Sequence, residues 1–158
     1  MKNFILILLV IIVSCKTLRK HKTEKLPYRP LISFDKDTAS YIKYNFIERK
    51  QAYLNKNINV LIEDTEVPVK YYTDGGSAKY VDSIPYIYLK FYRADVTDRK
   101  IIEKKDPTIL VIHLVTSLST NVTGPLLRKI HGVWTKEAKE FYGEQKIKDI
   151  EIVNYNFK

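Results

Sequence analysis

The sequence predicts an α+β fold, in which an antiparallel sheet of about five or six strands packs against one long amphipathic N-terminal helix and a shorter C-terminal helix. Three observations support this class. Residues 38–55 show a helical hydrophobic period, short alternating or apolar segments separated by turn residues follow, and a second capped helical segment begins after Thr135. The short turns between the strand segments favour hairpin connections and therefore antiparallel pairing.

The long helix is expected from Thr38 to about Asn55, with Asp37 as its N-cap residue. At 100° per residue, one stripe of this helix consists of Ala39, Ile42, Phe46 and Tyr53. The other side consists of Tyr41, Tyr44 and Glu48. An apolar stripe of this kind commonly packs on a core, and an exposed partner-binding helix is the rarer alternative.

Six segments are expected to form short strands, namely 59–62, 67–72, 84–93, 100–103, 108–117 and 146–155. A strong turn is expected at Asp74-Gly75-Gly76, because glycine accepts positive φ. Residues 108–117 are almost continuously apolar, which indicates a central strand covered on both faces. A helical turn at 126–130 should begin at Pro125, and the second helix should run from its cap Thr135 to Tyr142, with Gly143 as its stop.

The strand 84–93 alternates and carries a stripe of tyrosines. One face holds Ile87, Leu89 and Phe91, and the other holds Tyr86, Tyr88, Lys90 and Tyr92. Tyr71 or Tyr72 is expected beside this stripe on a neighbouring strand. Tyrosine suits a binding surface for a protein or a glycan, but a tyrosine row also suits a sheet face packed beneath the amphipathic helix, which is the commoner arrangement.

The first residues raise a separate question, since Phe4 to Val13 is a run of ten apolar residues after Lys2. A membrane-spanning helix needs about 20 such residues. A core strand of this length and size would be unusual. A secretory signal peptide has an apolar segment of this length.

The segment Ile12-Val13-Ser14-Cys15 at the end of this run resembles the lipobox of bacterial lipoproteins, and the resemblance covers residues 1–15. It implies that residues 1–14 are a cleaved signal peptide and that Cys15 becomes the first residue of the mature protein and carries the acyl chains. The bilayer is then a partner through Cys15, because two or more acyl chains give stable attachment. An uncleaved signal anchor with an incidental cysteine is the alternative.

The family's sorting rules imply the periplasmic face of the outer membrane. Lys16 follows the cysteine, where an Asp would indicate retention in the inner membrane, and no acidic tract follows. The frequent Ile, Lys, Asn and Tyr residues are also similar to the composition of small lipoproteins of the Bacteroidetes type.

The net charge of +9 lies mostly next to this segment. Residues 34–158 hold 20 Lys and Arg against 17 Asp and Glu, a net of only +3, so the folded region does not indicate nucleic-acid binding. Residues 15–33 are expected to form a lipidated, basic and flexible tether, and 34–158 a single α+β domain. The basic tract either rests on anionic headgroups or is a solvated linker.

No catalytic or metal-binding constellation stands out, so no metal and no cofactor are expected. The chain has one cysteine and no His-x-x-x-His motif. His113 shares a strand face with two valines, which is typical of a sheet-face histidine. His131 precedes Gly132 and Trp134 in a loop, so His131 and Trp134 join the tyrosine stripe as candidate binding residues.

The expected function is therefore that of a lipid-anchored periplasmic envelope protein with a non-catalytic binding or scaffolding domain. One alternative is a small envelope hydrolase or transferase that uses His131 and a nearby carboxylate. Another is an immunity-type inhibitor of a toxin enzyme. A deep cleft that joins His131 to Asp or Glu would favour the enzyme, and a flat tyrosine-rich face would favour binding.

Overall fold

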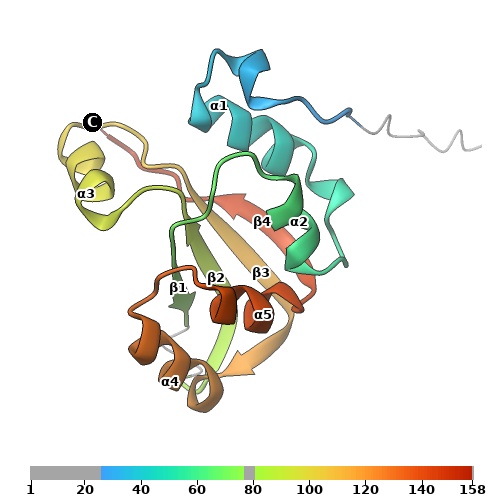
Figure 1. Ribbon diagram of the computed structural model, residues 1–158, viewed down its shortest axis with the longest axis vertical. Helices are drawn as coiled ribbons and strands as arrows, with labels where there is room; N and C mark the ends of the chain where they lie inside the picture. Colours follow the sequence, from blue (N-terminus) through green and yellow to red (C-terminus); the bar gives the residue numbers. More distant parts are fainter. Residues whose placement is uncertain (1–25, 77–80, 158) are drawn as a thin grey trace, which may run out of the picture.

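The computed structural model describes residues 26–76 and 81–157, and these form an α+β fold with a four-stranded antiparallel sheet and five α-helices (Figure 1). The strands follow one another across the sheet in chain order: β1 (Tyr71–Gly75), β2 (Ser83–Lys90), β3 (Ile109–Ser119) and β4 (Ile147–Ile152). The helices are α1 (Thr38–Ile42), α2 (Ile58–Asp64), α3 (Ala94–Ile102), α4 (Thr120–Ile130) and α5 (Lys136–Gly143). The predicted class and the antiparallel pairing are confirmed.

The prediction of five or six strands is wrong for the described residues, because two of the predicted strands are helices. The segment 59–62 lies in α2, where Ile58 and Leu61 are both fully buried. These positions are three residues apart, which is a helical spacing, and a short apolar run does not by itself distinguish a helix from a strand. The segment 100–103 coincides with the end of α3.

The predicted long helix forms, but it is not a uniform α-helix. The carboxylate of Asp37 caps α1 as predicted by accepting hydrogen bonds from the backbone N–H groups of Ala39 and Ser40, at 3.1 and 3.3 Å. The helix then widens into a π-helical turn, η2 (Lys43–Glu48), and ends in a 3₁₀ turn, η3 (Lys50–Ala52).

The widened turn changes which side chains are buried. Tyr41 and Phe46, five residues apart, are both fully buried. Because a π-helix bonds residue i to residue i+5, this spacing places them on one side. The prediction that Tyr41 lies opposite the apolar stripe is therefore wrong.

An N-terminal strap, residues 26–34, lies against this helix (Figure 1). Asn45 is fully buried, accepts the backbone N–H of Arg29 at 3.1 Å and donates to the carbonyl of Arg29 at 2.8 Å. The carboxylate of Glu66 accepts the hydroxyl of Tyr28 at 2.8 Å. The described part of the expected tether is thus fastened to the domain, which extends further toward the N-terminus than the sequence indicated.

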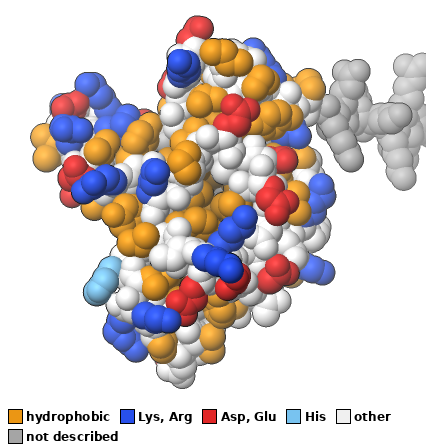
Figure 2. All heavy atoms as spheres, in the orientation of Figure 1, with side chains coloured by type: hydrophobic (Ala, Val, Ile, Leu, Met, Phe, Trp, Pro, Cys, Tyr) orange, Lys and Arg blue, Asp and Glu red, His pale blue; other side chains and the backbone are white. Residues whose placement is uncertain are grey.

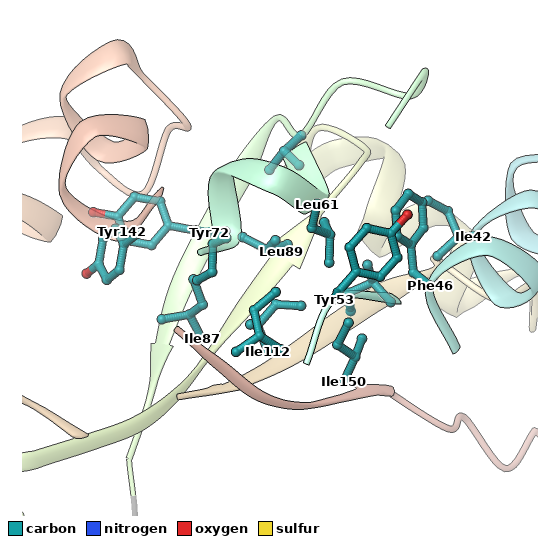
Figure 3. Packing of buried hydrophobic residues seen from close by; sticks show 14 of the residues in the cluster. Ile42, Phe46, Tyr53, Leu61, Tyr72, Ile87, Leu89, Ile112, Tyr142 and Ile150 are labelled. Atoms are coloured by element: carbon teal, nitrogen blue, oxygen red, sulfur yellow. The ribbon is translucent and has the colours of Figure 1, made fainter. Parts of the chain in front are cut away.

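The core lies between the helices and one face of the sheet (Figure 3). Antiparallel register sets Ile87 opposite Ile112 and Leu89 opposite Leu110, and all four side chains are fully buried. The residues that cover them from the helical layer include Ile42, Phe46, Leu61 and Tyr142. The helical layer of α1, η2, α2 and α5 therefore occupies one side of the sheet.

The C-terminal helices follow the predicted caps in part. The hydroxyl of Thr135 caps α5 as predicted by accepting the N–H of Ala138 at 3.3 Å. Helix α4 begins earlier than expected, because Ser119 caps it, and Pro125 lies inside the helix rather than at its start. Among the described residues, none of the helices combines the length and the apolar character that crossing a bilayer requires.

Candidate functional site: the tyrosine face

The register of the sheet decides where the tyrosine stripe lies. Residues that are paired directly across antiparallel strands share a face. Three rows cross the sheet on the side opposite the core: Tyr71, Lys90 and Ile109; Thr73, Tyr88, Val111 and Glu151; and Gly75, Tyr86, His113 and Asp149. We call these three rows the tyrosine face.

The tyrosine face carries no layer of helices among the described residues. The buried core side chains of α1, α2 and α5 pack with those of the opposite face, and α3 and α4 follow the ends of β2 and β3 (Figure 1). Tyr86, Tyr88, Lys90 and Tyr92 are all half-buried. The arrangement in which the tyrosines pack beneath the amphipathic helix is therefore not the one observed. Antiparallel sheets commonly keep one such open face.

Aromatic contacts fix the side chains at one end of this face. The Tyr86 ring meets the Tyr88 ring edge to face at 5.5 Å between centroids and lies 5.4 Å from the ring of His113. Tyr86 also covers its cross-strand partner Gly75, where an added Cβ would collide with the ring. Gly75 is thus needed for the close approach of Tyr86. Burial raises the pKa of the Tyr88 hydroxyl, and the neighbouring Tyr86 raises it further.

A hollow of about 230 Å³ brings three predicted candidates together, namely Lys90, Tyr92 and His131. It lies between β1, α3 and the end of α4. The remaining lining residues are Tyr71, Tyr72, Thr73, Ala94, Thr97 and Asp98. We call this hollow of about 230 Å³ the first hollow. The side chain of Lys100 lies over the Tyr92 ring, with its Nζ 4.6 Å from the centroid.

His131 reaches this hollow because it ends α4 in the left-handed conformation, with φ of 51°. The chain then turns at Gly132 and runs along the free edge of β1. The N–H of Tyr72 donates to the carbonyl of Gly132 at 2.7 Å, and the N–H of Trp134 donates to the carbonyl of Lys70 at 2.9 Å. This return fixes the histidine beside Tyr71, which sequence spacing alone does not indicate.

A second hollow of about 280 Å³ adjoins the first and shares Thr73 and Lys90 with it. Its other lining residues are Tyr88, Ile109, Val153 and Tyr155. Burial raises the pKa of the Tyr155 hydroxyl. We call the two hollows together the groove. Tyr155 was not among the predicted binding residues, because its place beside Tyr88 depends on how the chain leaves β4.

The predicted candidates Tyr86 and Trp134 lie apart from the groove lining, and so does His113. Trp134 packs against the rings of Tyr72 and Tyr142, with centroids at 5.8 and 6.3 Å. His113 lies on the tyrosine face as a sheet-face histidine, and its Nε2 is 3.4 Å from a carboxylate oxygen of Glu151. Only the tertiary structure separates the residues that line the groove from those that support it.

The first hollow does not assemble a catalytic pair. Asp98 and His131 both line it, but no hydrogen bond or ion pair within the described part of the chain joins His131 to a carboxylate. A general base normally needs an orienting partner within hydrogen-bond reach. In residues 26–76 and 81–157, no three His, Cys, Asp or Glu side chains are grouped so that they could hold a metal ion. Cys15 lies outside the described residues.

The fold and the groove define a class of protein: an α+β domain whose sheet is covered by helices on one face and open, tyrosine-rich and grooved on the other. No protein-family model matches the chain, and no curated protein or solved structure matches it either. The function is therefore inferred from the chemistry of this face. Figure 2 shows the helical side of the molecule, where charged and apolar side chains are interspersed.

Proposed function

We propose that this protein is a lipid-anchored component of the bacterial cell envelope, and that its domain binds a partner through the tyrosine face without transforming it. One observation carries the proposal: a row of half-buried tyrosines lines an open sheet face and two adjoining hollows. Tyrosine is enriched where proteins bind partners, because it combines a large apolar ring with a polar tip. A rigid sheet holds these rings in place before the partner arrives, which lowers the entropy cost of binding.

The proposal favours binding over catalysis because of the groups that the groove contains. Its titratable side chains include Lys90, Asp98 and His131, but the described contacts join none of them into a pair that could move a proton. The hydrolase or transferase alternative needs such a pair. An immunity-type inhibitor remains one form that a protein-binding function could take.

The anchor in this proposal is Cys15, and the strap supports a short connection to it. Leu26 is fixed to the domain through its carbonyl, which accepts the Nε of Arg49 at 2.8 Å. Eleven residue steps separate Cys15 from Leu26, so even a fully extended chain places the acyl group within about 40 Å of the domain. The proposed location is the periplasmic face of the outer membrane.

The anchor is tested by replacing Cys15 with alanine. The native chain should fractionate with outer membranes, and its intact mass should lack residues 1–14 and include acyl chains. The C15A variant should be released into the soluble fraction by a salt wash, because it lacks the acyl chains that give stable attachment and the attraction of its basic residues to the membrane is screened by salt. Retention of the variant on salt-washed membranes, or a mature chain that begins at Met1, would contradict the proposal.

The binding face is tested by photo-crosslinking in native envelopes. A benzoylphenylalanine residue at position 88, in the groove, should give a defined crosslinked species. The matched control is the same residue at position 44, because Tyr44 is also half-buried but lies on the helical layer, where its hydroxyl bonds the strap. Equal crosslinking at both positions, or none at position 88, would exclude the tyrosine face as the binding surface.

A further inference from the structure

We propose that the groove binds a neutral glycan chain. This inference rests on the proposed function and names the class of its partner. The first and second hollows form two subsites of this chain, and Lys90 and Thr73, which line both, lie between them.

The shape of the groove favours an elongated ligand. The two hollows, about 230 and 280 Å³, adjoin and together fall within the range of about 300–1,000 Å³ that is usual for small-molecule sites. They extend from α3 and His131 across β1 and β2 to Ile109 of β3 and to Tyr155. A ligand that fills both therefore lies across the strands rather than along them.

The backbone of the sheet disfavours a peptide as the occupant. Peptides commonly bind a sheet by adding a strand to its edge, through backbone hydrogen bonds. Beside the groove, the edge of β1 already pairs with the segment of Gly132 and Trp134, through bonds of 2.7 and 2.9 Å. On the face itself the backbone groups are used in the strand ladders, so a ligand in the groove meets mainly side chains.

Those side chains match the surface of a sugar. The rings of Tyr71, Tyr88, Tyr92 and Tyr155 line the groove. The hydroxyl-bearing residues Thr73 and Thr97 also belong to the lining. A pyranose ring likewise presents apolar C–H groups on its faces and hydroxyl groups around its rim. Tyrosine hydroxyls are protonated at neutral pH and can therefore donate and accept hydrogen bonds. Burial raises the pKa of the Tyr88 and Tyr155 hydroxyls further.

The charges in the groove favour a neutral ligand. The lining contains one amine, Lys90, one carboxylate, Asp98, and the imidazole of His131, and the amine of Lys100 lies over the ring of Tyr92. An acidic polymer would meet Asp98, and a cationic peptide would meet Lys90 and Lys100, so neither finds a groove of a single opposite charge. A neutral chain can instead accept a hydrogen bond from the amine and donate one to the carboxylate.

The test uses the full chain, purified in detergent micelles, on an array of neutral, carboxylated and sulfated oligosaccharides, with extended neutral peptides as a counter-screen. We expect retention on neutral oligosaccharides of several sugar units. Titration calorimetry with the best-retained neutral oligosaccharide should show that Tyr88→Ala and Tyr155→Ala each weaken binding about ten-fold, because each removes an aromatic contact. Tyr88→Phe keeps the ring and should lose less.

The control is Tyr44→Ala, which removes a tyrosine from the helical layer and should leave glycan binding unchanged. Circular dichroism identifies any variant that fails to fold, and Tyr88→Phe then keeps the test decisive. Retention only on acidic glycans or only on peptides, no retention at all, or affinities that the groove variants leave unchanged would overturn the inference. If a protein is crosslinked at position 88 and no oligosaccharide of the array retains the chain, the glycan inference is wrong and the proposed binding function stands.

Discussion

Replacing Phe46 by alanine is expected to lower the free energy of unfolding by about 3–5 kcal/mol. Phe46 is fully buried in the π-helical turn η2, with its ring 5.9 Å from that of Tyr41 and 5.4 Å from that of Tyr53. Truncation removes the buried ring and leaves a cavity that the neighbouring tyrosines cannot fill without leaving their hydrogen bonds. A typical domain has a free energy of unfolding of about 5–15 kcal/mol, so this loss is a large part of the total.

Urea unfolding followed by circular dichroism measures this loss. The matched control is Ile47→Ala, which truncates the next residue of the same turn, where the side chain is only half-buried. The control should cost clearly less, because less apolar area is removed from the core. Equal losses for the two variants would show that η2 does not direct Phe46 into the core as described.

Alkaline pH is expected to unfold the protein, because two tyrosines bury their hydroxyls against carboxylates. The hydroxyl of Tyr142 donates to Asp74 at 2.7 Å, and that of Tyr53 donates to Asp64 at 2.9 Å. Burial raises the pKa of each hydroxyl, and the hydrogen bond to the carboxylate raises it further. In the unfolded chain both should ionise near pH 10.

The sign of the effect follows from proton binding. Above pH 10 the folded state keeps protons that the unfolded state has released, so the free energy of unfolding falls as the pH rises. The contribution is fully present below pH 10 and is lost as the pH rises from there toward the folded pKa values. In this range each of the two tyrosines lowers the free energy of unfolding by at most about 1.4 kcal/mol per pH unit.

The ultraviolet absorbance of tyrosinate, recorded together with circular dichroism, checks this expectation. Part of the tyrosinate signal should appear only as the tertiary structure is lost. Tyr142→Phe should reduce the steepness of the loss above pH 10, because one of the late-titrating groups is absent. Complete ionisation near pH 10 in a chain that stays folded would show that these hydroxyls are not held as described.

The binding proposal also depends on how firmly the groove is built. Its residues lie on paired strands and on segments that hydrogen bonds attach to the sheet, such as the return of the chain at Gly132. The strap ties the N-terminal end of the described chain to the helical layer, on the other side of the sheet. The described chain therefore begins on the side of the sheet opposite the tyrosine face.

Short-range patterns in the sequence determined the fold class and several of its details. The caps at Asp37 and Thr135 were predicted because a side chain bonds backbone groups only two or three residues away. The alternation of β2 and the apolar run of β3 were predicted because strand periodicity is local. The lipobox resemblance at Cys15 is also local, and the lipid anchor that it implies stays a prediction.

The tertiary structure decided what depends on distant parts of the chain. Whether the tyrosine side or the leucine side of β2 meets the helices depends on how the helical layer docks, and both sides carry large side chains with apolar surface. The helical state of α2 and the widened turn at Phe46 bring Ile58, Leu61 and Phe46 into the core, whose other residues come from distant parts of the chain. Lys90, Tyr155 and His131 come to line one groove only through strand register and the turn at Gly132, because hydrogen bonds between distant residues, and not the spacing within a segment, set those positions.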